Sequence, residues 1–170
     1  MDVMEWLCQR QEGFGELRPE ERHRAAEFAM MWTFFEAKVC ANEARPSVLI
    51  DVSNELVQQG AIEAAVVSST VDYFKARYVS DGALNERFPH LHFPAGRPRA
   101  LVIECLQGEK SDTAASLAAS LLIVLRYRNN FFHGTKWGYN LRDQTGNFEI
   151  AINLLRVVMD AFQQICPERR

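Results

Sequence analysis

Apolar residues recur along this chain at intervals of three and four positions, the spacing that places them on one face of an α-helix. Strand-like alternation is weak throughout, and glycine and proline interrupt the helical pattern only at wide intervals. The pattern predicts helices over Val3–Gln11, Pro19–Ala44, Ser47–Gln59, Ala61–Val79, Arg99–Gln107, Asp112–His133 and Asn147–Cys166. We therefore expect an all-α fold, an antiparallel bundle of about five to six helices.

Breaks in the pattern predict how the chain is divided. Gly13 and Gly15 follow the first short helix, and Pro19 begins the next one with two glutamates in its first turn. We expect residues 1–18 to form an N-terminal helical extension and residues 19–170 to form the helical domain. The segment 88–94 contains two prolines and is expected to be a surface loop.

Two charged residues fall within the apolar stripes of the two longest predicted helices. The stripe of the 112–133 helix consists of Leu117, Leu121, Val124, Leu125 and Phe132. Arg128 lies in the middle of that stripe, and Glu36 lies within the stripe of the 19–44 helix. Because an unpaired buried charge costs several kcal/mol, we expect Glu36 and Arg128 to pair. The pair could serve structure alone or form part of a working site.

The charge distribution narrows the possible ligands. The chain of 170 residues has a net charge of -3, and acidic residues are concentrated near its N-terminus. Between Thr113 and Arg142 there is no Asp or Glu, although Arg126, Arg128 and Lys136 fall there. A local positive site on an acidic protein suits a small anion or a short piece of RNA better than a long duplex.

His133 ends the same helix, directly before Gly134. On an ideal helix it diverges from Arg128 by about 140°, so the two side chains do not touch along a straight cylinder. The end of a helix frays, however, and both residues can border one groove, particularly a groove completed by a second subunit. The C-terminal end of the helix favours a protonated imidazole.

The string Arg128-Asn129-Asn130-Phe131-Phe132-His133-Gly134 resembles the signature of the HEPN superfamily, in which an Arg is followed by four to six residues and then a His. The wider segment 125–136 resembles small bacterial members, and the segment 31–38 resembles their first long helix. The similarity covers most of the chain as an order of helices, and its specific part is the motif itself. It implies that residues 19–170 form a HEPN-like domain.

The resemblance implies a metal-independent endoribonuclease that acts as a homodimer with its motifs facing each other. His133 would act on the RNA 2′-hydroxyl or protonate the leaving oxygen, and Arg128 would hold the scissile phosphate. Asn129 would position the phosphate or orient the Arg, and Glu36 matches an acidic residue that joins the site in some members. Lys136, Arg126 and Asn130 are the expected further contacts to RNA. Toxin–antitoxin or phage-defence roles are implied too, with an antitoxin or another defence protein as partner.

The chemistry is coherent without the family. Cleavage by internal attack needs a proton acceptor with a pKa near neutral and a cation beside the phosphate, and it needs no metal. Arginine suits the second role because its fork donates two hydrogen bonds to phosphate oxygens. One departure is Thr135, because some toxin members carry a tyrosine two positions after the histidine. Mechanisms that depend on that tyrosine are therefore not expected here.

Two alternatives remain, and a third lacks support. The first is a non-catalytic HEPN module that binds a protein partner or a nucleotide. The second is a metal site at His90 and His92, with Glu86 and Asp81 as the nearest further ligands. The third, a serine or cysteine hydrolase, has no supporting strand–turn–helix signature.

The remaining features are those of an ordinary cytoplasmic protein. No stretch approaches the ~20 apolar residues of a membrane span, and the N-terminus does not have the pattern of a signal peptide. The four cysteines are widely spaced, without a Cys-x-x-Cys pair, and are expected to be small core residues. We expect no cofactor, no metal and no membrane partner.

Overall fold

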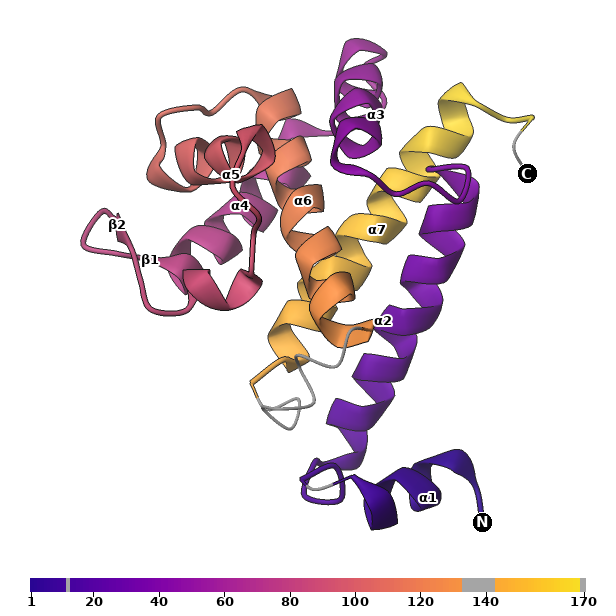
Figure 1. Cartoon of the computed structure of the whole chain (residues 1–170). Coiled ribbons are helices and arrows are strands. Elements are labelled where there is room, and N and C mark those ends of the chain that lie inside the picture. Colours follow the sequence, from indigo (N-terminus) through magenta and orange to yellow (C-terminus); the bar gives the residue numbers. More distant parts are fainter. Residues whose placement is uncertain (12, 133–142, 169–170) are drawn as a thin grey trace.

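The computed structural model describes residues 1–11, 13–132 and 143–168, and it is an all-α structure with one very short β-hairpin (Figure 1). Its elements are α1 (Val3–Arg10), α2 (Pro19–Lys38), α3 (Pro46–Gln58), α4 (Ala64–Tyr78), β1 (Val79–Ser80), β2 (Ala83–Leu84), the 3-10 helix η1 (Phe88–Leu91), α5 (Arg97–Gln107), α6 (Thr113–Phe132) and α7 (Thr145–Ile165). Among the described residues, no helix is long and apolar enough to cross a membrane.

Helix α6 lies at the centre, with α3, α4 and α5 packed against it and α2 packed against α7 (Figure 1). Most of α6 is buried, including Leu117, Leu121 and Val124, each of which has no exposed surface. A helix that is apolar on nearly all sides must be covered on nearly all sides, which explains its central place. Helix α7 has the clearer amphipathic pattern, and its inner residues Phe148, Leu155 and Val158 are buried.

Most predicted helix ends agree with the structure to within two residues, and two differ more. Helix α2 ends at Lys38 rather than Ala44, because Ala41 and Asn42 adopt positive φ angles of 50° and 64°, which no α-helix can contain. Helix α4 begins at Ala64 rather than Ala61.

Two small elements between α4 and α5 were not predicted. Asp81 and Gly82, both with positive φ, form the two-residue turn of an antiparallel hairpin that pairs Val79 with Leu84. The proline-bracketed segment predicted as a loop contains η1, whose Phe88 and Leu91 are buried in the core.

The first eighteen residues divide into an outer helix and an anchored connection. Helix α1 begins with a capping box, in which Asp2 and Glu5 each accept a hydrogen bond from the other's backbone nitrogen, and none of its residues is buried. Phe14 and Leu17, in contrast, are each 4% exposed and belong to the hydrophobic core. The segment predicted as an extension is therefore tied to the bundle at its C-terminal end.

A buried polar network joins α4, α6 and α7. The hydroxyls of Tyr78 and Tyr127 lie 2.7 Å apart, and Tyr127 and Tyr73 each donate to Oδ1 of Asn147, both over 3.1 Å. Burial raises the pKa of Tyr78 to about 12 and also raises that of Tyr127. Because each hydroxyl has a partner, these polar groups are buried without the cost of an unmade hydrogen bond.

The four cysteines are free thiols. Cys40 and Cys105 are buried, as expected, and burial raises their pKa to about 12 and about 11. Cys8 and Cys166 are only partly covered.

Candidate functional site

Arg128 lies in the last turns of α6, where the side chain is 30% exposed. Its Nη2 lies 3.3 Å from Oε2 of Glu36, which comes from α2 and is 21% exposed. The pairing expected from the two interrupted stripes is therefore confirmed. The pair is partly exposed to solvent rather than fully buried, so part of the Arg128 side chain is accessible.

The carboxylate of Glu36 is itself held in place by α2. Trp32 lies one helical turn before it, and Nε1 of this indole donates a hydrogen bond of 2.8 Å to the same Oε2. Trp32 is 1% exposed, so its ring is fixed by the core. A rigid buried indole therefore orients the carboxylate that orients Arg128.

The guanidinium of Arg128 has further partners. Nη1 donates to Oδ1 of Asn129 over 3.0 Å. The guanidinium carbon lies 5.8 Å from the centre of the Trp32 ring and 5.6 Å from that of Phe132, which are cation–π distances. Nε of Arg128 is buried and has no hydrogen-bond partner among the described residues. The arrangement holds the guanidinium in one orientation, as a phosphate-binding arginine requires.

Sequence reasoning missed the roles in this site of two aromatic side chains, Trp32 and Phe132. Trp32 precedes Glu36 by four residues and Phe132 follows Arg128 by four, so both share a helix face with the charge they contact. That spacing was the available signal. The expectation that Phe132 is part of the buried stripe is wrong, because the side chain is 52% exposed.

Arg126 does not join this site. It diverges from Arg128 by about 200° around α6, so it points to another side of the helix. Its Nε donates to the carbonyl oxygen of Leu91 over 2.9 Å, and its guanidinium lies 5.8 Å from the Phe93 ring. Burial lowers the pKa of Arg126. The structure thus separates two arginines that the sequence placed in one basic stretch.

Asn130 is also turned away from the site. It is 2% exposed, and its side-chain nitrogen donates to the carbonyl oxygens of His90 and Leu91 over 3.0 and 3.4 Å. A buried amide committed to the backbone of η1 has no access to an RNA phosphate. We therefore assign Asn130 to holding η1 against α6 and omit it from the RNA contacts.

His133 and Lys136, the remaining predicted site residues, lie outside the described residues, as does Thr135. The described part of the site is therefore Arg128, Asn129 and Glu36, with the two aromatic rings.

The metal site considered at His90 and His92 gains no support. Among the described residues, no group of three or more His, Cys, Asp or Glu side chains is placed to hold a metal ion. His92 ends η1 in the left-handed conformation, with φ of 52°.

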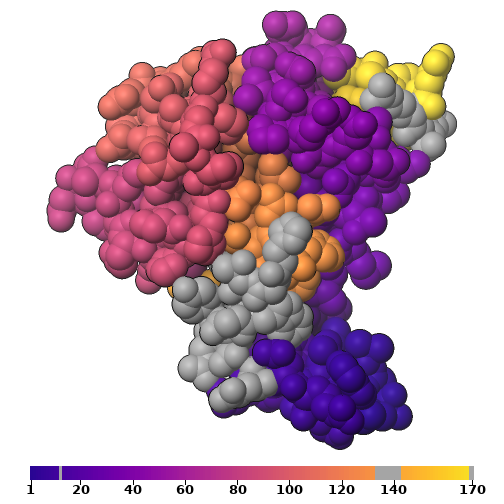
Figure 2. All heavy atoms as spheres, viewed as in Figure 1, coloured from indigo at the N-terminus to yellow at the C-terminus, as the bar shows by residue number. Residues whose placement is uncertain are grey.

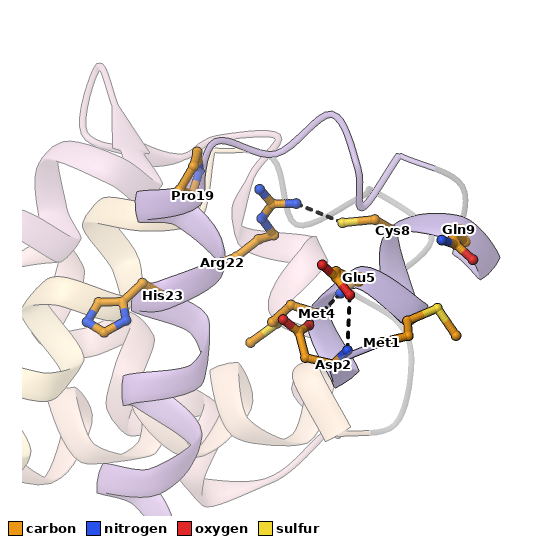
Figure 3. A pocket seen from close by; sticks show the side chains of 9 residues that line it. All are labelled: Met1, Asp2, Met4, Glu5, Cys8, Gln9, Pro19, Arg22 and His23. Carbon is orange, nitrogen blue, oxygen red and sulfur yellow. Dashed lines mark hydrogen bonds between the residues drawn. The ribbon is translucent and has the colours of Figure 1, made fainter.

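A hollow of about 830 Å³ lies between α1 and the start of α2, far along the chain from Arg128 (Figure 3). Figure 3 shows Arg22 pointing toward Cys8, whose sulfur accepts a hydrogen bond of 2.8 Å from Nη1. Asp2 and Glu5 face each other within the capping box. Most of the polar groups around this hollow are thus already engaged with one another.

Comparison of the chain with protein-family models, with curated proteins and with solved structures found no match. The resemblance to the HEPN superfamily accordingly rests on the motif residues and on the order of the helices.

Proposed function

We propose that this protein is a metal-independent endoribonuclease built on a HEPN-like bundle. The observation that carries the proposal is the held orientation of Arg128. Its guanidinium is bonded to Glu36 and Asn129 and lies over two aromatic rings, while the side chain as a whole is 30% exposed. Arg128 also stands five residues before His133 in the chain. A fixed, accessible fork is what stabilises charge developing on a phosphate.

In the proposed reaction the RNA 2′-hydroxyl attacks the adjacent phosphorus, and the bond from phosphorus to the 5′-oxygen breaks. The products are a 2′,3′-cyclic phosphate and a free 5′-hydroxyl. His133 takes the proton of the 2′-hydroxyl or protonates the leaving 5′-oxygen. Arg128 donates hydrogen bonds to the non-bridging oxygens, and Glu36 and Asn129 keep its guanidinium in position. Lys136 is a proposed contact to a flanking phosphate.

The direct test is cleavage of labelled single-stranded RNA by the purified protein in EDTA, with Arg128→Lys, Arg128→Ala and His133→Ala beside it. We expect cyclic phosphate ends from the wild type and a loss of about tenfold or more for Arg128→Lys, which keeps the charge but not the fork. Arg97→Ala is the matched control, because Arg97 is an exposed arginine at the start of α5, near the opposite end of α6. Equal activity of all variants would refute the assignment.

We also propose that the active form is a homodimer, because one Arg and one His offer little surface for gripping RNA. Helix α1 contributes no buried residue and exposes Val3, Met4 and Trp6, a surface that a second copy can cover. Sedimentation equilibrium of the wild type and of Trp6→Glu measures whether the chain forms a dimer through this surface. A wild type that stays monomeric at all concentrations would contradict the dimer.

The toxin or phage-defence role is a separate proposal, since an RNA-cleaving enzyme must be controlled by a partner if it attacks the RNA of its own cell. Induced expression in a bacterial host should arrest growth for the wild type and not for His133→Ala. Normal growth with active purified enzyme would reject toxicity and leave the nuclease intact.

Two observations favour a second candidate, a non-catalytic interaction module. Glu36 compensates the charge of Arg128, and α2 exposes Met30 and Phe34, 74% and 56% exposed, as a partner-binding surface would. Folded wild-type protein that cleaves none of a varied set of RNAs would favour this module over the nuclease.

A further inference from the structure

A hollow of about 970 Å³ lies along the outer face of α2, between the end of α6 and the middle of α7. Phe34 and Met30 come from α2, Phe132 from α6, and Ile152 and Arg156 from α7. Figure 2 shows that α6, drawn in orange, reaches the surface beside α2. The hollow therefore begins next to Arg128, whose guanidinium lies 5.6 Å from the Phe132 ring.

The lining combines exposed aromatic rings with cations. Phe132 and Phe34 are 52% and 56% exposed, although aromatic rings of this size are normally covered. Each ring has a cation near it, Arg128 beside Phe132 and Nζ of Lys38 at 5.7 Å from the centre of Phe34. Proteins that bind single-stranded nucleic acid use this combination, in which bases stack on rings and cations follow the backbone.

The charges favour an anionic ligand over a second copy of the chain. Arg24 and Arg156 line the hollow, and the acidic residue that lines it, Glu27, is already bonded to Arg24 at 2.8 Å. Arg156 forms no ion pair with any described residue. A net positive lining on a chain of charge -3 matches a polyanion, whereas two copies would bring like charges together.

We propose that this hollow binds the nucleobases of single-stranded RNA next to the phosphate held by Arg128, with Phe132 as the stacking surface. The inference rests on the proposed function, because it takes RNA as the ligand of Arg128. One face of Phe132 supports the guanidinium, and the exposed remainder of the ring receives a base. The subsite thus prefers unpaired RNA, since a base in a duplex has no free face to offer.

The test is fluorescence anisotropy with a labelled 2′-O-methyl single strand of about 12 nucleotides, which cannot be cleaved and matches the known range of site sizes. The variants are Phe132→Leu, which keeps an apolar side chain without a ring, and Phe132→Trp, which enlarges the ring. Phe93→Leu is the matched control, because Phe93 is a half-exposed ring 5.8 Å from the guanidinium carbon of Arg126, outside the hollow.

We expect Phe132→Leu to weaken binding by about tenfold, the loss of one stacked base. Phe132→Trp should bind at least as tightly as the wild type, and Phe93→Leu should bind as the wild type does. Equal binding by all four proteins would overturn the subsite. A wild type that does not bind the RNA strand would also overturn it. A third contrary result is a Phe132→Leu variant that sediments as a monomer where the wild type is a dimer, with RNA binding unchanged, because the hollow would then be an interface between copies.

Cleavage assays on the same proteins separate this inference from the nuclease proposal. Ring-dependent binding without cleavage would support the subsite and reject the nuclease. Cleavage by the wild type with ring-independent binding would support the nuclease and reject the subsite.

Discussion

Glu36 and Arg128, 92 residues apart in the chain, form an ion pair with 3.3 Å between Oε2 and Nη2. The pair joins α2 to the end of α6, and Trp32 binds the same carboxylate oxygen at 2.8 Å. A half-buried pair of this kind has two effects. It fixes the orientation of the arginine, and it makes the stability of the bundle depend on both charges being present.

The first prediction concerns the energy of this pair. In a double-mutant cycle of Glu36→Ala and Arg128→Ala, we expect a coupling of about 1–2 kcal/mol, because either single change leaves the other charge partly buried and unpaired. Urea unfolding at low salt measures it. Glu43 and Arg45, more than 60% exposed, are the control pair and should show a much smaller coupling. Additive single changes at Glu36 and Arg128 would contradict the structural argument.

The second prediction separates the two neighbouring asparagines. Asn130→Ala should lower the free energy of unfolding by about 1–3 kcal/mol, because a buried amide is removed from α6 and the carbonyl oxygens of His90 and Leu91 each lose one hydrogen bond. Asn129→Ala is the matched control. It removes the same atoms from a half-exposed position and should cost less than about 1 kcal/mol. Equal losses would show that Asn130 does not hold η1.

The third prediction is that Gly146→Ala lowers stability in the wild type but not in a Tyr73→Phe background. A Cβ at this position would lie 2.8 Å from the hydroxyl oxygen of Tyr73, which is bonded to Asn147. We expect Gly146→Ala to destabilise the protein by about 1–3 kcal/mol. In a Tyr73→Phe background the obstacle is gone, and the same change should be neutral or stabilising by about 0.5–1 kcal/mol, since alanine favours helix. Thermal unfolding of the wild type, the two single variants and the double variant measures these effects. If Gly146→Ala lowers stability by a similar amount in both backgrounds, the contact with Tyr73 is rejected.

The fourth prediction is that stability falls in alkaline solution. Burial, with a smaller effect of the Glu36 charge, raises the pKa of Cys40 from its ordinary 9.0 to about 12, and burial raises that of Tyr78 from 10.0 to about 12. The unfolded chain therefore loses these protons first. The free energy of unfolding should be highest below pH 9 and should fall as the pH rises from there toward about 12, by at most about 1.4 kcal/mol per pH unit for each group.

Urea unfolding at about pH 8 and about pH 10.5 measures the decline. Cys40→Ala and Tyr78→Phe each remove one titrating group, so each should show a shallower dependence on pH than the wild type. The same slope in all three proteins would mean that other groups cause the decline.

The candidate site was only partly predictable from the sequence. The Glu36–Arg128 pair was found because each charge interrupts an apolar stripe, and such a charge needs a partner. Arg126 and Asn130 were grouped with Arg128 because they are close in sequence. In the structure they turn to the carbonyl oxygens of η1, a contact between segments more than thirty residues apart that no local pattern encodes.

The sequence by itself determined the helical class, the order of the helices and most of their ends, because spacing, proline and glycine act on the local backbone. The tertiary structure alone decided which apolar faces are covered. Phe132 and Leu125 belong to one predicted stripe, yet Leu125 is 6% exposed, whereas Phe132 lines the open hollow between α2 and α7 and is 52% exposed. The periodicity of the sequence predicts which residues share a face of a helix. The positions of the other helices determine which part of that face is exposed to water.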